Sequence, residues 1–177
     1  MTYFKTRDIV AIVMCAALWG ALNLTLAPII FQMTRLPFTC DLLGFVTLTL
    51  VTWWTRKLGA ASLTGLLVAG LTFAIRPNAL YMFGFIAASI LFDILTRLVG
   101  YQNSIEKPLP SIISIISFST ICAGVAGLII GRFFLEFPAP LELWAGLHAI
   151  GGFIGGVIGI TIIRALAARQ VRPSHIR

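Results

Sequence analysis

Six long hydrophobic segments occupy most of this 177-residue chain. Hydrophobic residues make up 59% of the sequence and charged residues only 11%. A soluble domain of this size needs far more charge to cover its surface, whereas a helix needs roughly 20 apolar residues to cross the hydrocarbon core of a bilayer. The sequence therefore predicts an all-α membrane protein, in which residues 1–177 form a single bundle of six transmembrane helices.

The helices are expected at about 9–28, 42–55, 60–75, 80–99, 112–135 and 143–168. Pro77 should end the third helix, because proline cannot donate a hydrogen bond to the helix ladder. Residues 100–110 contain two prolines and are predicted to be the longest linker. The second and third helices are short for a bilayer, so the run of apolar residues defines their ends less sharply than those of the other helices.

Lysine and arginine are distributed unevenly between the connections. If both termini lie in the cytoplasm, three basic residues face outward, at positions 35, 76 and 132, and ten face inward. Cytoplasmic loops carry an excess of basic residues, so this count predicts a multi-pass protein of the cell membrane with both termini cytoplasmic. The net charge of +7 does not indicate nucleic-acid binding, because the basic residues lie at helix ends and form no stripe. The inward set is Lys5, Arg7, Arg56, Lys57, Arg97, Lys107, Arg164, Arg169, Arg172 and Arg177.

The chain carries none of the sequence motifs that indicate catalysis. It lacks HExxH, GxSxG, a phosphate-binding loop and a dinucleotide-binding glycine pattern. Cys15, Cys40 and Cys122 are far apart and have no metal-ligand spacing, so we interpret them as packing residues. We expect no enzymatic activity, no catalytic residue, no metal and no cofactor. Active uptake would have to draw its energy from a partner or from an ion gradient.

Small residues recur every four positions in three of the predicted helices, which brings them onto one face. Such rows let neighbouring helices approach closely. In the first helix the row serves either packing within the bundle or docking of another membrane subunit; in the last two helices we favour internal packing. The rows are Ala17/Ala21 and Ala16/Gly20 in the first helix, Ala123/Gly127/Gly131 in the fifth, and Gly151/Gly155/Gly159 and Gly152/Gly156 in the sixth.

Aromatic and hydrogen-bonding residues gather on the outward side under the predicted topology. Each alone is typical of an interfacial anchor, but together they indicate a small-ligand pocket in an otherwise apolar protein. Arginine would suit an anionic group, glutamate a cationic one, and the aromatic rings of Trp144, Tyr81 and Phe83 a stacked heterocycle. The predicted substrate-binding residues are Arg35, Arg76, Asn78, Tyr81, Arg132, Glu136, Glu142, Trp144 and His148.

Asp93 lies deep in the fourth predicted helix, one turn before Arg97. Ionisable groups inside a membrane are costly, and these two can pair on one helix face. We favour a structural ion pair, and the alternative is a stand-alone secondary transporter or channel that uses Asp93 for proton coupling. A third hypothesis is an intramembrane enzyme built on His148, Glu142 and Arg132.

Taken together, the chain resembles the substrate-binding S component of energy-coupling factor (ECF) vitamin transporters. The resemblance rests on the small size, the six helices, the cytoplasmic termini and the Ala17-x-x-x-Ala21 ridge, and it covers essentially the whole chain. The turn at 56–61, with sequence RKLGAA, looks like that of the hydroxymethylpyrimidine/thiamine type.

The resemblance implies a small vitamin-like ligand, held in an outward cavity formed by the last three helices and the outer loops. It also implies that Ala17 and Ala21 dock onto a transmembrane coupling subunit that sits on two ABC ATPases. The whole S component would topple in the bilayer to deliver the ligand inward.

Overall fold

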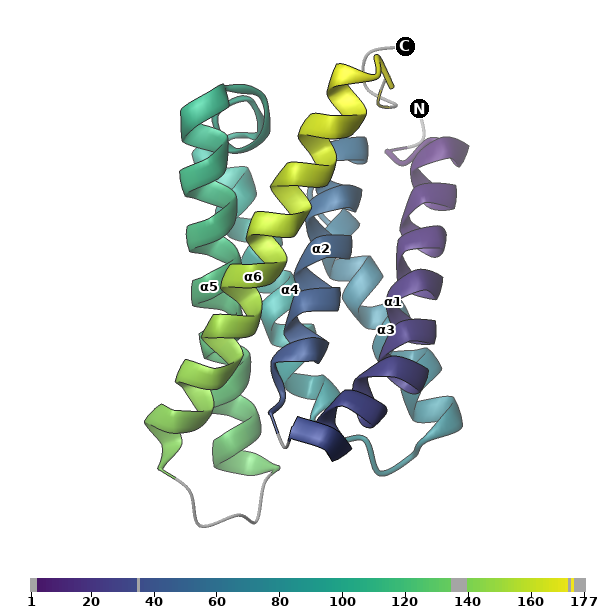
Figure 1. Cartoon of the computed structure of the whole chain (residues 1–177). Coiled ribbons are helices and arrows are strands. Elements are labelled where there is room, and N and C mark those ends of the chain that lie inside the picture. The colour runs from purple at the N-terminus through teal and green to yellow at the C-terminus, as the bar shows by residue number, and fades with distance from the viewer. Residues whose placement is uncertain (1–2, 35, 135–139, 172, 174–177) are drawn as a thin grey trace.

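The computed structural model describes residues 3–34, 36–134, 140–171 and 173. Within these ranges the regular structure is entirely helical, which confirms the all-α prediction. Figure 1 shows an elongated bundle in which the start of α1 and the end of α6 lie at the same end. The elements are α1 (Thr6–Thr34), α2 (Phe38–Thr55), α3 (Ala60–Ile75), α4 (Met82–Val99), a short π-helix η1 (Gln102–Glu106), α5 (Pro108–Phe133) and α6 (Leu141–Ala168).

Five of these helices, α1, α2, α4, α5 and α6, are long and apolar enough to cross a membrane. The remaining apolar helix, α3, has 16 residues, so it is about 24 Å long against a hydrocarbon core of about 30 Å. A helical protein with several membrane-spanning candidates is therefore established by length and composition. The helix α3 is apolar but shorter than these five candidates.

The helix α1 continues past the predicted end at 28 and runs through Pro28 to Thr34. Proline has no N–H, so the carbonyl of Leu24, four residues earlier, loses its helical partner. The guanidinium of Arg76 donates a hydrogen bond to that carbonyl at 3.0 Å. A side chain from the end of α3 thus replaces the missing backbone donor, which is consistent with the helix extending beyond the proline.

Two other predicted boundaries were wrong. The helix α2 begins at Phe38 instead of 42, so Asp41, just outside the predicted helix, lies in its first turn. The predicted linker over 100–110 is largely helical, because η1 fills its centre and α5 already starts at Pro108. Proline is well tolerated at the first position of a helix, where its N–H would have no partner anyway.

The helix α2 lies at the centre of the bundle, where it packs against α1, α3 and α6 and also contacts α4 and α5. Several of its threonine hydroxyls donate to carbonyls of the same helix, as Thr49 does to Phe45 at 2.6 Å and Thr55 to Val51 at 2.8 Å. These threonines can therefore be buried in the least apolar of the five long helices, because their hydroxyl groups are satisfied locally, whereas the hydroxyls of Thr39 and Thr52 have no partner among the described residues.

The glycine rows of α6 pack against two different neighbours. Gly155 and Gly159 face Leu42 and Thr49 of α2, whereas Gly152 and Gly156 face Ser119 and the adjacent turn of α5. In each case a Cβ atom would press against a neighbouring helix, so the absent side chains set the helix spacing. The prediction of internal packing for these rows is confirmed.

The predicted ion pair between Asp93 and Arg97 was wrong. Asp93 Oδ2 accepts hydrogen bonds from the N–H of Gly59 at 2.8 Å, the N–H of Ser62 at 3.1 Å and the Ser62 hydroxyl at 2.8 Å. These groups belong to the start of α3, whose first N–H groups have no helical partner. Asp93 is therefore a capping group supplied to α3 by α4, and within the described ranges no ion pair joins it to Arg97.

A second buried carboxylate lies near the start of α1. Asp8 is fully buried, and its Oδ2 lies 2.7 Å from the ammonium of Lys57 in the α2–α3 turn. The same oxygen accepts from the backbone N–H of Lys5 at 2.9 Å. This contact ties the beginning of α1 to the turn between α2 and α3.

Candidate ligand-binding pocket

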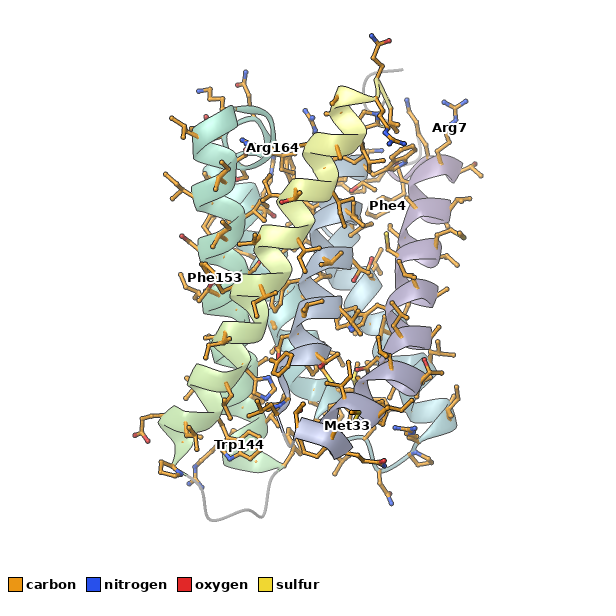
Figure 2. The ribbon with its side chains drawn as sticks, in the orientation of Figure 1. Phe4, Arg7, Met33, Trp144, Phe153 and Arg164 are labelled. Carbon is orange, nitrogen blue, oxygen red and sulfur yellow. The ribbon has the colours of Figure 1, made fainter. Side chains whose placement is uncertain are left out.

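A cavity of about 310 Å³ opens at one end of the bundle. Figure 2 places Trp144 and Met33 at this end and Phe4, Arg7 and Arg164 at the opposite end, where α1 begins and α6 finishes. The volume of the cavity is at the lower end of the range for small-molecule sites. The residues that line it are Asn23, Ala27, Pro28, Phe31, Leu36, Pro37, Thr39, Cys40, Arg76, Tyr81, Phe85, Ile130, Trp144 and His148.

The pocket brings together four of the predicted site residues: Arg76, Tyr81, Trp144 and His148. Three others, Asn78, Arg132 and Glu142, are exposed and do not line the cavity. The remaining two predictions, Arg35 and Glu136, lie outside the described residues. The aromatic residues and the histidine are thus collected in one place, whereas the described charged positions, apart from Arg76, are not.

Trp144 and His148 are one turn apart on α6, so their rings lie on the same face, with centroids 6.4 Å apart. Gly127 of α5 allows this face to approach closely. A Cβ at Gly127 would lie 2.7 Å from the carbonyl oxygen of Trp144 and 2.8 Å from the Cβ of His148. The glycine row of α5 therefore determines how deeply the two rings enter the bundle.

His148 pairs with Asp41, a residue that sequence reasoning did not place in the site. The imidazole Nδ1 lies 2.7 Å from the carboxylate Oδ2, and both side chains are buried. Gly151 permits this contact, because a Cβ there would meet the carbonyl of Phe38 and lie 2.9 Å from the Cβ of Asp41. Among the described residues no group of three or more His, Cys, Asp or Glu side chains is placed to hold a metal. We therefore interpret the two side chains as a buried, closely paired polar unit in the pocket wall.

Four polar atoms of pocket-lining residues are buried without a hydrogen bond to the described residues: Asn23 Oδ1, Thr39 Oγ1, Trp144 Nε1 and His148 Nδ1, the last of which has only its short contact with Asp41. The amide nitrogen of Asn23 donates a long hydrogen bond of 3.8 Å to the sulfur of Met82. Buried polar groups are nearly always paired, so a cluster of unpaired ones requires an explanation. A bound molecule with complementary donors and acceptors supplies one.

Tyr81 and Arg76 contribute from the connection between α3 and α4. The Tyr81 ring packs edge-on against Phe85, with centroids 6.4 Å apart. Burial raises the pKa of the Tyr81 phenol above its ordinary value, so the hydroxyl stays protonated at neutral pH and can both donate and accept. Arg76 is exposed, and its Nη2 is already bonded to the Leu24 carbonyl.

The predicted small-residue rows of α1 divide between two surfaces. Ala16 and Gly20 are buried, and a Cβ at Gly20 would lie 2.7 Å from a methyl group of Leu71 in α3. Ala17 and Ala21 are exposed on the outside of the bundle, beside exposed apolar residues such as Val13 and Met14. One row therefore serves internal packing, and the other remains available to a neighbour in the membrane.

The walls of the pocket combine aromatic rings with a few convergent polar atoms, which is the usual composition of a small-molecule site. This pocket and the exposed face of α1 are the two structural features that bear on function. No family model, curated protein or solved structure matches the chain.

Proposed function

We propose that this chain is the substrate-capturing S component of an ECF-type importer in the cell membrane. In this proposal six helices cross the bilayer, both termini are cytoplasmic, and the pocket faces outward. The ligand is a small vitamin or vitamin precursor of the thiamine-related class. A transmembrane coupling subunit and two ABC ATPases drive its delivery to the cytoplasm.

The observation that carries this proposal is the position of the pocket relative to the basic residues. The pocket lies at the end of the bundle opposite the start of α1, and Arg7 and Arg164 lie at the other end (Figure 2). If the arginine-rich end is cytoplasmic, as the positive-inside rule favours, the pocket opens outward. Capture of an external solute is the natural task of such a site.

The exposed ridge of α1 supports the proposed partner. Ala17 and Ala21 present small side chains on the outside of the bundle, where a helix of a coupling subunit can approach closely. Within the described residues α1 is also the least buried of the long helices. A helix with one packed face and one free apolar face is suited to a contact with a second membrane protein.

The proposed ligand capture can be tested by identifying what the protein carries from native membranes. Mass spectrometry of gently purified protein should detect one small heteroaromatic compound at near-stoichiometric amounts. The same compound, added to ligand-free protein, should raise its melting temperature by several degrees, because a molecule that binds only the folded state stabilises it. A screen of vitamins and precursors that yields no stabilising compound would contradict the proposal.

Tryptophan at both positions of the α1 ridge should abolish partner-dependent uptake. In Ala17→Trp/Ala21→Trp protein two large rings replace the small side chains that permit close helix approach. Uptake by cells that express the full complex should fall about tenfold or more, because lost docking removes the energy source, while ligand binding by the isolated subunit stays unchanged. Ile113→Trp/Ile121→Trp is the matched control, since both positions are exposed on α5. Intact uptake in the α1 variant would exclude this face as the docking surface.

A further inference from the structure

The pairing of His148 with Asp41 restricts what His148 can offer a ligand. Nδ1 faces the carboxylate at 2.7 Å, so Nε2 is the ring nitrogen that remains for the pocket. A carboxylate can only accept a hydrogen bond. With a neutral ring, the proton must therefore lie on Nδ1, and Nε2 presents a lone pair.

The start of α2 contributes a field that favours the ionised form of Asp41, against the cost of burying a carboxylate. Asp41 lies in the first turn of the helix, and Pro37 provides no side-chain cap. The first N–H groups of a helix are unpaired and carry partial positive charge, which stabilises a nearby carboxylate. The helix start is thus one contribution to the acceptor state of Asp41.

The unpaired atoms around His148 complete a pattern of hydrogen-bonding groups. Asn23 Oδ1 adds a second acceptor, and Trp144 Nε1 adds a donor that cannot accept. The rings of Phe85 and Trp144 lie beside the imidazole, with centroids 6.2 Å and 6.4 Å from it. The pocket therefore combines flat apolar walls with these two acceptors, this donor, and the hydroxyls of Thr39 and Tyr81, which can donate and accept.

We propose that the ligand donates an N–H or O–H hydrogen bond to Nε2 of His148, and that Asp41 is the positioning residue that makes this nitrogen an acceptor. The ligand class is a flat heteroaromatic molecule with an amino or hydroxyl substituent. This inference rests on the proposed function, because it takes the pocket as the ligand site. It goes further because it names the groups that select between ligands: Nε2 of His148 contacts the ligand, and Asp41 sets the protonation of that ring.

Two soluble probes of similar size and shape test the assignment. Aminopyrazine carries N–H donors, and methoxypyrazine replaces them with an ether oxygen. Calorimetry on the purified protein at about pH 8 should show binding of aminopyrazine about tenfold tighter than methoxypyrazine, because the latter leaves the Nε2 acceptor of His148 unpaired.

Asp41→Asn should cancel or reverse this preference. The amide can donate to Nδ1, which allows the ring proton to move to Nε2 and turns the acceptor into a donor. His148→Phe in the same background removes both ring nitrogens without leaving a buried charge, and it should bind the two probes equally. Asp8→Asn is the matched control, because it neutralises a buried, paired carboxylate near the far end of the bundle and should keep the tenfold preference.

Failure of this inference differs from failure of the proposed function. An unchanged probe preference in Asp41→Asn, or no binding of either probe at millimolar concentration, would overturn the assignment to the Asp41–His148 pair. A native ligand could still copurify, and uptake could still depend on the partner complex. Conversely, Asp41→Asn could reverse the preference for aminopyrazine while uptake needs no ATPase partner. That result would reject the ECF-type importer and retain ligand recognition by the Asp41–His148 pair.

Discussion

Replacing Gly152 with valine is expected to lower the free energy of unfolding by about 2–3 kcal/mol, a typical cost of overpacking a tightly packed contact. A Cβ at this position would press against the backbone carbonyl of Ser119 and the Cβ of Ala123, both in α5. Neither atom is the end of a flexible chain, so α5 and α6 would have to separate. These two helices form the most extensive contact in the bundle.

Gly146→Val provides the matched control for this prediction. It lies on the same helix and has the same loss of glycine and gain of a β-branched residue, but a Cβ there would meet nothing within 4 Å. Unfolding followed in detergent, by heat or by added dodecyl sulfate, should separate the two variants clearly. Equal stability would mean that the α5–α6 contact tolerates an extra side chain and does not fix the helix spacing.

Gly152→Val should also weaken ligand binding. Trp144 and His148 reach the pocket from the part of α6 that Gly127 and Gly131 hold against α5. A displaced α6 would carry the His148 ring away from Phe85 and would break the contact of His148 with Asp41. The glycine rows therefore connect the packing of the bundle to the geometry of the pocket.

Much of the helical framework could be predicted from the sequence, because each helix is encoded locally. A run of apolar residues sets a helix, and a turn such as that at Pro77 ends it, so α3 was predicted at its observed bounds of 60–75. The rows of glycine in α6 likewise follow from the helical period of the sequence. Their partner helices could not be predicted, because which helix lies opposite each row is a property of the tertiary arrangement.

The polar contacts of the site were harder to predict for the same reason. Asp41 lies just before the predicted helix of 42–55, yet its partner is His148, more than a hundred positions later. Asn23 lies within an apolar helix and carries no local sign of facing a cavity. Arg132 and Glu142 were grouped with the site because they belong to the same end of the bundle, but shared depth does not make a residue line the pocket.

Asp93 shows how a local rule can select the wrong partner. The spacing of Asp93 and Arg97 satisfies the one-turn rule for a helical ion pair, which is worth only about 0.2–0.5 kcal/mol on an isolated helix. The observed alternative gives the carboxylate three hydrogen bonds from the start of α3. Hydrogen bonds to a charged group in a buried setting are individually stronger than such a pair, so the distant contact prevails.

Asp93→Ala should therefore destabilise the protein by about 3 kcal/mol, because it leaves buried donors of α3 without an acceptor. Asp93→Asn keeps a carbonyl oxygen and should cost about 1 kcal/mol, and Ser62→Ala, which removes one of the three bonds, should cost a similar amount. Unfolding in detergent checks this order. Equal stability of the alanine variant and the unaltered protein would exclude the capping role.

The asparagine variant also separates the capping role from the proton-coupling alternative. A carboxylate that exchanges protons with a gradient cannot be replaced by an amide, so a stand-alone transporter would lose its flux in liposomes while its fold remained intact. A cap needs only an acceptor, so the S component with Asp93→Asn should still bind its ligand and still support partner-dependent uptake. Asp93 is buried, and its Oδ2 already receives three donors at the start of α3. Protonation of that oxygen would weaken those bonds and loosen the end of α3, which makes the residue a poor site for repeated proton exchange.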